Sequence, residues 1–250
     1  MTIMGRRVPM LASLLVWFLL WELVGRLGLI MLIPPFTGVV AAGVAMLPTG
    51  KFQDAIGITL HAFAVGLAFS LAVGIGVGVL MGRIRAVGDV LGMWVNIFES
   101  SPLTAIIPVL MAVLGFGQTT VIVTVFLFSV WVIALDTQVG VRQINPSLVE
   151  MARSFGAGRL QLYGKILIFA ALPEILAGVR LGLIRGVKGV VIGQLLIAII
   201  GVGELFELYS RNFLMEEFWA LIVLVFAFAF ALSELVGLIE RRVDYYAGAR

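Results

Sequence analysis

Cysteine is absent from the 250-residue sequence, and histidine occurs once, as His61. Without cysteine the chain can form neither a disulfide nor a thiolate metal site, and a single histidine with no acidic companion at ligand spacing does not make a metal site. We expect His61 to be an ordinary interfacial side chain. Charged residues are also scarce, at 12%, whereas 62% of the residues are hydrophobic and the mean hydropathy is +1.15. This composition excludes an ordinary soluble domain and predicts an integral membrane protein.

A nucleotide-binding loop is also missing. That motif requires G-x-x-x-x-G-K-[ST], and the nearest segments are TGKF around Lys51 and YGKI around Lys165. Neither has Ser or Thr after the lysine, and neither has the first glycine at the required distance. The sequence contains no Ser-His-Asp set either. We therefore expect no enzyme and no cofactor on this chain, so energy for any active process must come from a separate subunit.

Long apolar segments, in contrast, are abundant. They predict an all-α integral membrane fold, because a membrane barrel would show shorter segments of alternating polarity. We expect one transmembrane domain over residues 1–250 and an uncleaved first span after Arg6 and Arg7. The segment IPPFTGVVAAGVAMLPTGKFQ predicts a short interfacial helix instead of a further span. The six predicted transmembrane helices cover residues 10–32, 58–82, 89–114, 119–140, 174–200 and 218–239.

Lysine and arginine residues, leaving out Arg180, Arg185 and Lys188 inside the fifth span, are distributed unequally between the two sides. One side would carry Arg26, Lys51 and Arg211, whereas all the others would lie on the opposite side. Cytoplasmic loops carry the excess of positive residues, so we expect both termini and the loop at about 141–173 to be cytoplasmic. The residues on the predicted cytoplasmic side are Arg6, Arg7, Arg83, Arg85, Arg142, Arg153, Arg159, Lys165, Arg241, Arg242 and Arg250.

The second span carries a small residue at every fourth position, a pattern that lets two helices approach closely. We interpret it as a packing surface, with a sliding interface as the alternative. The stripe consists of Gly66, Ser70, Gly74, Gly78 and Gly82.

The cytoplasmic segment NPSLVEMARSFGAGRLQLYGKI, residues 145–166, is polar and yet contains helix signals. Asn145 followed by proline predicts a helix start, although Ser147 and Glu150 also match a capping box; in either case Glu150 would lie in the first turn. Gly156 predicts the end of this helix, and a second helix can begin near Arg159. A helix of about two turns is not stable alone in water. It must pack on the chain's own helices, lie on lipid headgroups or dock onto a partner.

The order Glu150-Met151-Ala152, three residues, Gly156, nine residues and Ile166 resembles the EAA loop of bacterial ABC importer permeases, E-A-A, three residues, G, nine residues, I-x-L-P. The segments LPEILAGVRLGLIRGVKGVVIGQLL and SSPLTAIIPVLMAVLGFG are similar to the nitrate, sulfonate, taurine and bicarbonate branch of that family. The resemblance covers nearly the whole chain. Two departures are Met151 in place of the first alanine and Phe169 in place of the usual proline.

This resemblance implies a type I, MetI-like permease of the bacterial cytoplasmic (inner) membrane. It also implies a second permease copy, identical or similar, an external solute-binding protein, surrounding lipid, no nucleic acid, and ATPase subunits that bind Mg-ATP. The loop would form coupling helices that sit in a cleft of the ATPase. The residues that the resemblance assigns to this docking are Glu150, Met151, Ala152, Arg153, Phe155, Gly156 and Ala157.

Charged and polar residues inside the spans are costly and mark a candidate translocation path, since the third to fifth core spans line the path in type I importers. The alternative interpretation is that acids and bases pair between helices. Arg185 and Lys188 favour an anionic substrate, although Gly193-Gln194 replaces the Ala-Glu of sulfonate-type relatives. A secondary transporter that uses Glu99 and Asp136 as an ion relay is a competing function. The candidate path residues are Asn96, Glu99, Asp136, Arg185, Lys188 and Gln194.

Overall fold

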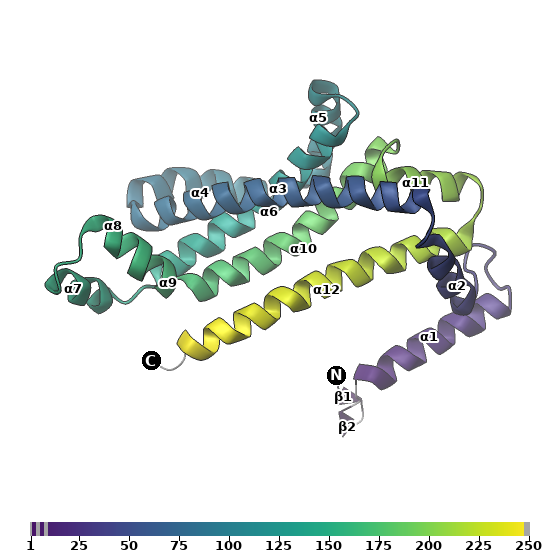
Figure 1. The fold of residues 1–250 in the computed structure, drawn as a ribbon, viewed down its shortest axis with the longest axis horizontal. Helices are drawn as coiled ribbons and strands as arrows, with labels where there is room; N and C mark the ends of the chain where they lie inside the picture. The colour runs from purple at the N-terminus through teal and green to yellow at the C-terminus, as the bar shows by residue number, and fades with distance from the viewer. Residues whose placement is uncertain (1, 4–5, 8–9, 248–250) are drawn as a thin grey trace.

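The computed structural model describes residues 2–3, 6–7 and 10–247, and this part of the chain is almost entirely helical. Two short strands, Thr2–Ile3 (β1) and Arg6–Arg7 (β2), pair antiparallel near the N-terminus. The long helices run side by side (Figure 1). The helices are α1 Met10–Arg26, α2 Phe36–Met46, α3 Gly50–Arg83, α4 Arg85–Ser100, η1 Leu103–Ile106, α5 Ile107–Leu114, α6 Gln118–Arg142, α7 Pro146–Ser154, α8 Arg159–Leu162, η2 Tyr163–Leu167, α9 Ile168–Ala170, α10 Leu172–Ile197, α11 Gly201–Arg211 and α12 Met215–Ala247.

The centre of the bundle is α6, which packs between α3 and α10. The predicted small-residue stripe of α3 faces α6 at very short range. A Cβ atom on Gly78 would lie 2.5 Å from Thr137 Cβ, and one on Gly82 would lie 2.6 Å from Val141 Cβ. Ser70 within the stripe donates a hydrogen bond to the Phe126 carbonyl at 3.2 Å. The interpretation of the stripe as a packing surface is confirmed.

A second glycine stripe on α10 lets this helix also approach α6 closely, and Ile133 of α6 lies against glycines of both α3 and α10. A Cβ on Gly178 would lie 2.7 Å from Asp136 Cβ, and one on Gly182 would lie 2.6 Å from Ile133 Cδ1. Ser129 donates a hydrogen bond to the Gly182 carbonyl at 2.8 Å. The central three-helix contact therefore depends on small residues from both flanking helices.

Fewer helices than predicted are long and apolar enough to cross a membrane. Within the described residues these are α3, α6 and the Met215–Ile239 part of α12, and the bent pairs α4–α5 and α10–α11 could each add one. Helix α1 has 17 residues. The count of six spans and the orientation of the termini therefore remain predictions.

The third predicted span, residues 89–114, is wrong as a single helix, because α4 and the η1–α5 segment are bent by 92°. Pro102 lies at the bend and cannot donate a backbone hydrogen bond to the preceding turn. The Ser101 hydroxyl donates to the Ile97 carbonyl at 2.6 Å and so satisfies part of the last turn of α4.

The ends of two other predicted spans are also wrong. Helix α1 ends at Arg26 rather than at residue 32, and Gly28, with φ of 60°, turns the chain just after it. Helix α10 ends at Ile197, because Ala198 adopts a left-handed conformation with φ of 58°. The predicted short helix between the prolines is confirmed as α2.

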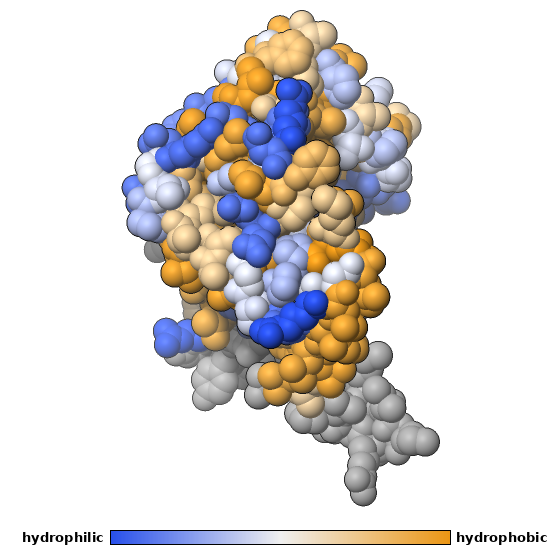
Figure 2. Space-filling model, turned by 90° about the vertical axis from the view of Figure 1, so that its right-hand side faces the viewer, coloured by the Kyte–Doolittle hydropathy of each residue, from blue (hydrophilic) through white to orange (hydrophobic). Residues whose placement is uncertain are grey.

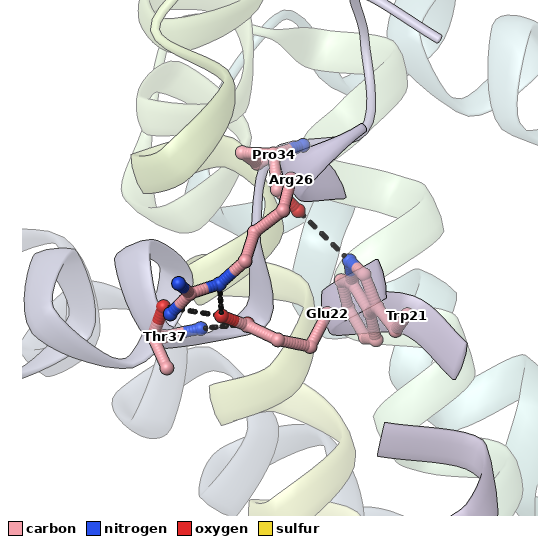
Figure 3. Close-up of polar contacts among 5 residues, drawn as sticks. All are labelled: Trp21, Glu22, Arg26, Pro34 and Thr37. Atoms are coloured by element: carbon pink, nitrogen blue, oxygen red, sulfur yellow. Dashed lines mark hydrogen bonds and ion pairs between the residues drawn. The ribbon is translucent and has the colours of Figure 1, made fainter. Parts of the chain in front are cut away.

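The carboxylate of Glu22, near the end of α1, caps the beginning of the next helix, α2 (Figure 3). Glu22 accepts hydrogen bonds from the Thr37 backbone N–H and the Thr37 hydroxyl, both at 2.9 Å, at the first turn of α2. Arg26 donates to the same carboxylate at 2.5 Å. Trp21 fixes the connecting segment by donating to the Pro34 carbonyl at 3.0 Å. The Glu22–Arg26 pair, four residues apart on α1, therefore also caps α2.

The end of the molecule that carries α2 and α11 has its own core, opposite the end that carries α7 (Figure 1). This core joins α2, α3, α11 and α12 and includes Val39, Phe52, Leu205 and Leu221. Seen end-on, hydrophilic side chains gather on this face beside an apolar surface (Figure 2). The exposed charged residues at this end include Lys51, Asp54, Glu204, Arg211 and Glu216.

Candidate functional site

The first helix of the polar loop between α6 and α10, α7, begins with an asparagine cap. Asn145 Oδ1 accepts hydrogen bonds from the Ser147 backbone N–H at 3.0 Å and from the Ser147 hydroxyl at 2.8 Å. The helix therefore starts at Pro146, and the alternative capping box of Ser147 and Glu150 is wrong. Glu150 lies beyond the first turn of α7, contrary to expectation.

The end of α7 is a glycine turn, as predicted. Gly156 has φ of 78°, a conformation that glycine adopts without strain and other residues rarely do. Its N–H donates to the Arg153 carbonyl at 2.9 Å, and the Ala157 N–H donates to the Ala152 carbonyl at 3.0 Å. These two bonds form a Schellman motif, which satisfies carbonyl groups that the helix end would otherwise leave without a partner.

The chain after this turn is a broken helix instead of one continuous second helix. Helix α8 begins at Arg159, as predicted, and the Gly158 N–H donates to Gln161 Oε1 at 3.0 Å. A π-helical turn, η2, follows and leads to α9. We refer to the segment from α7 to α9, Pro146–Ala170, as the coupling loop.

The coupling loop has a small core of its own. Ala152, Leu162 and Leu167 are buried, and Ile144 and Val149 pack against them. The apolar side of α7 is therefore covered largely from within the loop. A cavity of about 320 Å³ lies beside it, lined among others by Gly82 and Arg83 at the end of α3 and by Glu150 and Arg153 of α7.

The opposite side of α7 is open to solvent and includes two large apolar side chains. Phe155 is 86% exposed and Met151 is 51% exposed. Of the other residues assigned to docking, Glu150, Arg153 and Gly156 are exposed and Ala157 is half-buried. Ala152 is 5% exposed and faces the loop core, so its side chain is not part of the open surface.

Among the candidate path residues, two form a direct ion pair between α4 and α10. Arg185 Nη1 lies 2.5 Å from Glu99 Oε1, and the two side chains are 38% and 21% exposed, respectively. Asp136 of α6 is half-buried near both charges. Asn96 and Lys188 are exposed. The structure therefore brings three of the predicted residues together.

Gln194 lies elsewhere, in a fully buried joint between α3, α10 and α11. Its Oε1 accepts from the Thr59 hydroxyl at 2.9 Å and from the Val202 N–H at 3.2 Å. A Cβ on Gly203 would lie 2.0 Å from the Gln194 carbonyl oxygen, so α11 folds back closely on the end of α10. Gln194 therefore supports this joint, and its role in the translocation path stays a prediction. Thr59, its partner, was not singled out from the sequence, because a lone threonine in a span carries no distinguishing pattern.

His61 also has a polar partner. Its Nδ1 lies 2.8 Å from Gln118 Nε2, and both side chains lie on the exposed surface where α3 and α6 meet. Because the Gln118 amide nitrogen can only donate, Nδ1 acts as the acceptor.

The described residues thus form a bundle of apolar helices with an ion pair between α4 and α10 and a folded polar loop at one end. Comparison with known families identifies the class: the profile described as "Binding-protein-dependent transport system inner membrane component" matches residues 74–245, and the chain belongs to this family. It is a permease of the ABC importer type and a multi-pass protein of the inner membrane, and its relatives are transport subunits rather than enzymes.

Proteins similar to this chain include permeases of three bacteria. A "probable ABC transporter permease protein" of Brucella melitensis is 31% identical over 73% of this chain and 74% of its own length. The taurine transport system permease of Escherichia coli is 26% identical over 98% of this chain and 92% of its own. The nitrate import permease of Synechocystis is 28% identical over 69% of this chain and 65% of its own.

The fold is also that of a solved permease. The chain of an inward-facing MetNI methionine ABC transporter matches with a TM-score of 0.65 and 24% identity, over 77% of this chain and 95% of that one. This match shows the MetI-like fold predicted from the sequence.

Proposed function

We propose that this chain is the translocating subunit of an ATP-driven importer for a small anion, and that it receives force from a separate ATPase through the coupling loop. Two permease copies, identical or similar, form the path, Mg-ATP binds to the ATPase subunits, and an external solute-binding protein delivers the substrate at the α2–α11 end. The observation that carries the proposal is the coupling loop itself, a capped and internally packed unit that leaves Phe155 86% exposed.

The exposed apolar surface of α7 supports docking into a protein groove. An exposed phenylalanine beside an exposed methionine is unfavourable in water, and burying them yields about 25 cal/mol for each Å² of apolar surface removed from water. Aromatic side chains often carry most of the binding energy at such contacts. The charged residues Glu150 and Arg153 lie beside this patch and can make polar contacts at its rim.

The way the loop is built supports its role in transmitting force. Its core residues Leu162 and Leu167 connect α7 to the segment that enters α10, while Ile144 connects it to the end of α6. A displacement of α7 would therefore move the cytoplasmic ends of two central helices together.

Support for an anionic substrate comes from the positive residues of α10. Arg185 and Lys188 are three residues apart and lie on one side of this helix. The similar permeases are named for taurine and nitrate, which both carry an anionic group.

Co-purification tests the proposal. Tagged protein should retain a P-loop ATPase from its native membrane, and Phe155→Asp should lose that ATPase while staying folded. Phe213→Asp is the matched control, because Phe213 is 68% exposed on the turn between α11 and α12 and its left-handed backbone tolerates aspartate. Transport that continues in vesicles depleted of nucleoside triphosphates would contradict an ATP-driven importer and favour the ion-relay alternative with Glu99 and Asp136.

A further inference from the structure

The Glu99–Arg185 ion pair lies about halfway along α10, a helix that forms a candidate membrane span together with α11. Arg185 is 13 residues after the start of α10 and 12 before its end, which places it about 20 Å and about 18 Å from the two ends. Glu99 is 14 residues after the start of α4, or about 21 Å along that helix. Charges inside a membrane span are costly and are usually functional.

The pair is incomplete as a purely structural bridge. The contact joins Arg185 Nη1 to one oxygen of Glu99, whereas the second oxygen, Oε2, is buried with no hydrogen-bond partner in the described part of the chain. A buried ion pair stabilises a fold only when its remaining polar atoms are also satisfied. Arg185 is 38% exposed and has five N–H donors, so its guanidinium keeps capacity for another acceptor.

The surroundings of the pair combine a helix end with a second unsatisfied polar atom. Glu99 is the last residue but one of α4 and lies directly before the 92° bend at Ser101 and Pro102. Phe98, its neighbour, stacks on Trp131 of α6 at 4.5 Å. Trp131 Nε1 is a second buried polar atom without a partner among the described residues. A donor and an acceptor are thus both left unsatisfied where α4 meets α6.

We infer that Arg185 is the residue of the translocation path that contacts the anion, and that the Glu99 carboxylate is an internal counter-ion which the anion displaces. The inference rests on the proposed permease function and narrows its substrate to small sulfonates, carboxylates or oxyanions, which match a guanidinium through two oxygens. While the path is empty, Glu99 neutralises Arg185. When an anion binds, Glu99 moves away, and Arg185 and Lys188 face the anion together.

The test measures anion binding by the purified full chain in neutral detergent, without an ATPase. Thermal unfolding is followed by tryptophan fluorescence during titration with sodium methanesulfonate, at ionic strength kept constant with sodium chloride, because chloride cannot make the two-oxygen contact. Dimethyl sulfone is the neutral isostere. Glu99→Gln should lower the half-saturating methanesulfonate concentration at least about tenfold relative to the wild type, because the competing carboxylate closes the site most of the time. Dimethyl sulfone should have no effect on either protein.

Two control variants distinguish a specific anion site at Arg185 from the general effect of an arginine that has lost its acidic partner. Glu99→Gln with Arg185→Gln should abolish the saturable shift. Glu207→Gln frees Arg211 in the same chemical way, since the two form an ion pair on the exposed face of α11, and it should produce no saturable shift. The inference would be overturned if the wild type and Glu99→Gln had the same half-saturating methanesulfonate concentration. It would also be overturned if the saturable shift of the unfolding midpoint persisted after Arg185 is replaced.

A folding defect is also decisive. If Glu99→Gln does not fold, Glu99→Asp replaces it, because aspartate keeps the charge but withdraws the carboxylate by one methylene. The half-saturating methanesulfonate concentration of Glu99→Asp should then be lower than that of the wild type. Failure of both variants to fold would show that the pair is required for the structure and would overturn the inference. No ATPase takes part in the binding experiment, so failure to bind methanesulfonate would not affect the conclusion drawn from co-purification. Failure to co-purify an ATPase would likewise not affect the conclusion drawn from anion binding.

Discussion

At the scale of single residues, Gly156 has the most demanding backbone position in the coupling loop. Its φ of 78° is needed for both hydrogen bonds of the Schellman motif that closes α7. No atom beyond its chain neighbours lies within 4 Å of an added Cβ, so a side chain there acts through the backbone and not through a clash.

Replacing Gly156 with leucine should therefore disturb the loop without unfolding the bundle. A non-glycine residue in this conformation costs about 1–2 kcal/mol, which is sufficient to shift the end of α7 and the position of Phe155. We expect ATP-dependent uptake to fall several-fold while the amount of protein in the membrane stays the same. Gly158→Ala, at a glycine without positive φ, is the control. Equal uptake by both variants would contradict a role for the turn in coupling.

Gln194 is a second residue whose contribution to the stability of the protein can be tested. Removing its side chain leaves a cavity in a fully buried joint, although the Val202 N–H can still donate to Thr59 Oγ1 at 3.1 Å and the Thr59 hydroxyl to the Ala55 carbonyl at 2.8 Å. A large-to-small change at a buried position costs about 2–5 kcal/mol. Gln194→Ala should therefore lower the midpoint of thermal unfolding, and Thr59→Ala should lower it less. A larger effect on substrate affinity than on stability would instead return Gln194 to the path.

At the scale of elements, the close approach of α3 to α6 gives a prediction with a control on the same helix. Gly78→Ala would place Cβ 2.6 Å from the Ala134 carbonyl oxygen, a backbone atom that cannot move alone, and should destabilise the protein by about 1–3 kcal/mol. Gly76 has nothing within 4 Å of an added Cβ, so Gly76→Ala should be neutral or stabilising, since alanine is the better helix former. Thermal unfolding in mild detergent measures both, and equal midpoints would contradict the packing described.

The helices of this protein also differ in how far their ends and bends can be predicted from the sequence. The start of α7 at Asn145 and its end at Gly156 were predictable, because capping involves residues only a few positions apart. The bend after Ser101 was missed, since an isolated proline inside a long apolar run does not reveal how far the helix will turn. The π-helical turn at Tyr163–Leu167 has no recognised local signal either. The Glu99–Arg185 contact joins residues far apart in sequence, so the sequence supplied both residues but not their pairing.

At the scale of the whole molecule, the arrangement places the coupling loop and the α2–α11 core at opposite ends of one bundle (Figure 1). The candidate path residues Glu99 and Arg185 lie between these ends, with Arg185 about halfway along α10. An importer needs such a separation, because the solute-binding protein and the ATPase must act on the same helices from opposite sides. Which end faces the cytoplasm is predicted by the distribution of Lys and Arg.

The absence of cysteine makes this orientation directly testable, because a single introduced cysteine is the only thiol of the chain. Ser154 at the end of α7 and Ser210 near the end of α11 are both exposed serines at opposite ends of the bundle, so serine-to-cysteine is the same small change at each site. In intact cells with a permeable outer membrane, a membrane-impermeant maleimide should label Ser210→Cys and not Ser154→Cys. In inside-out vesicles the labelling should reverse, and detergent should make both reactive. Labelling of Ser154→Cys from outside would place the coupling loop on the side without ATP, and the proposed coupling to an ATPase could not operate there.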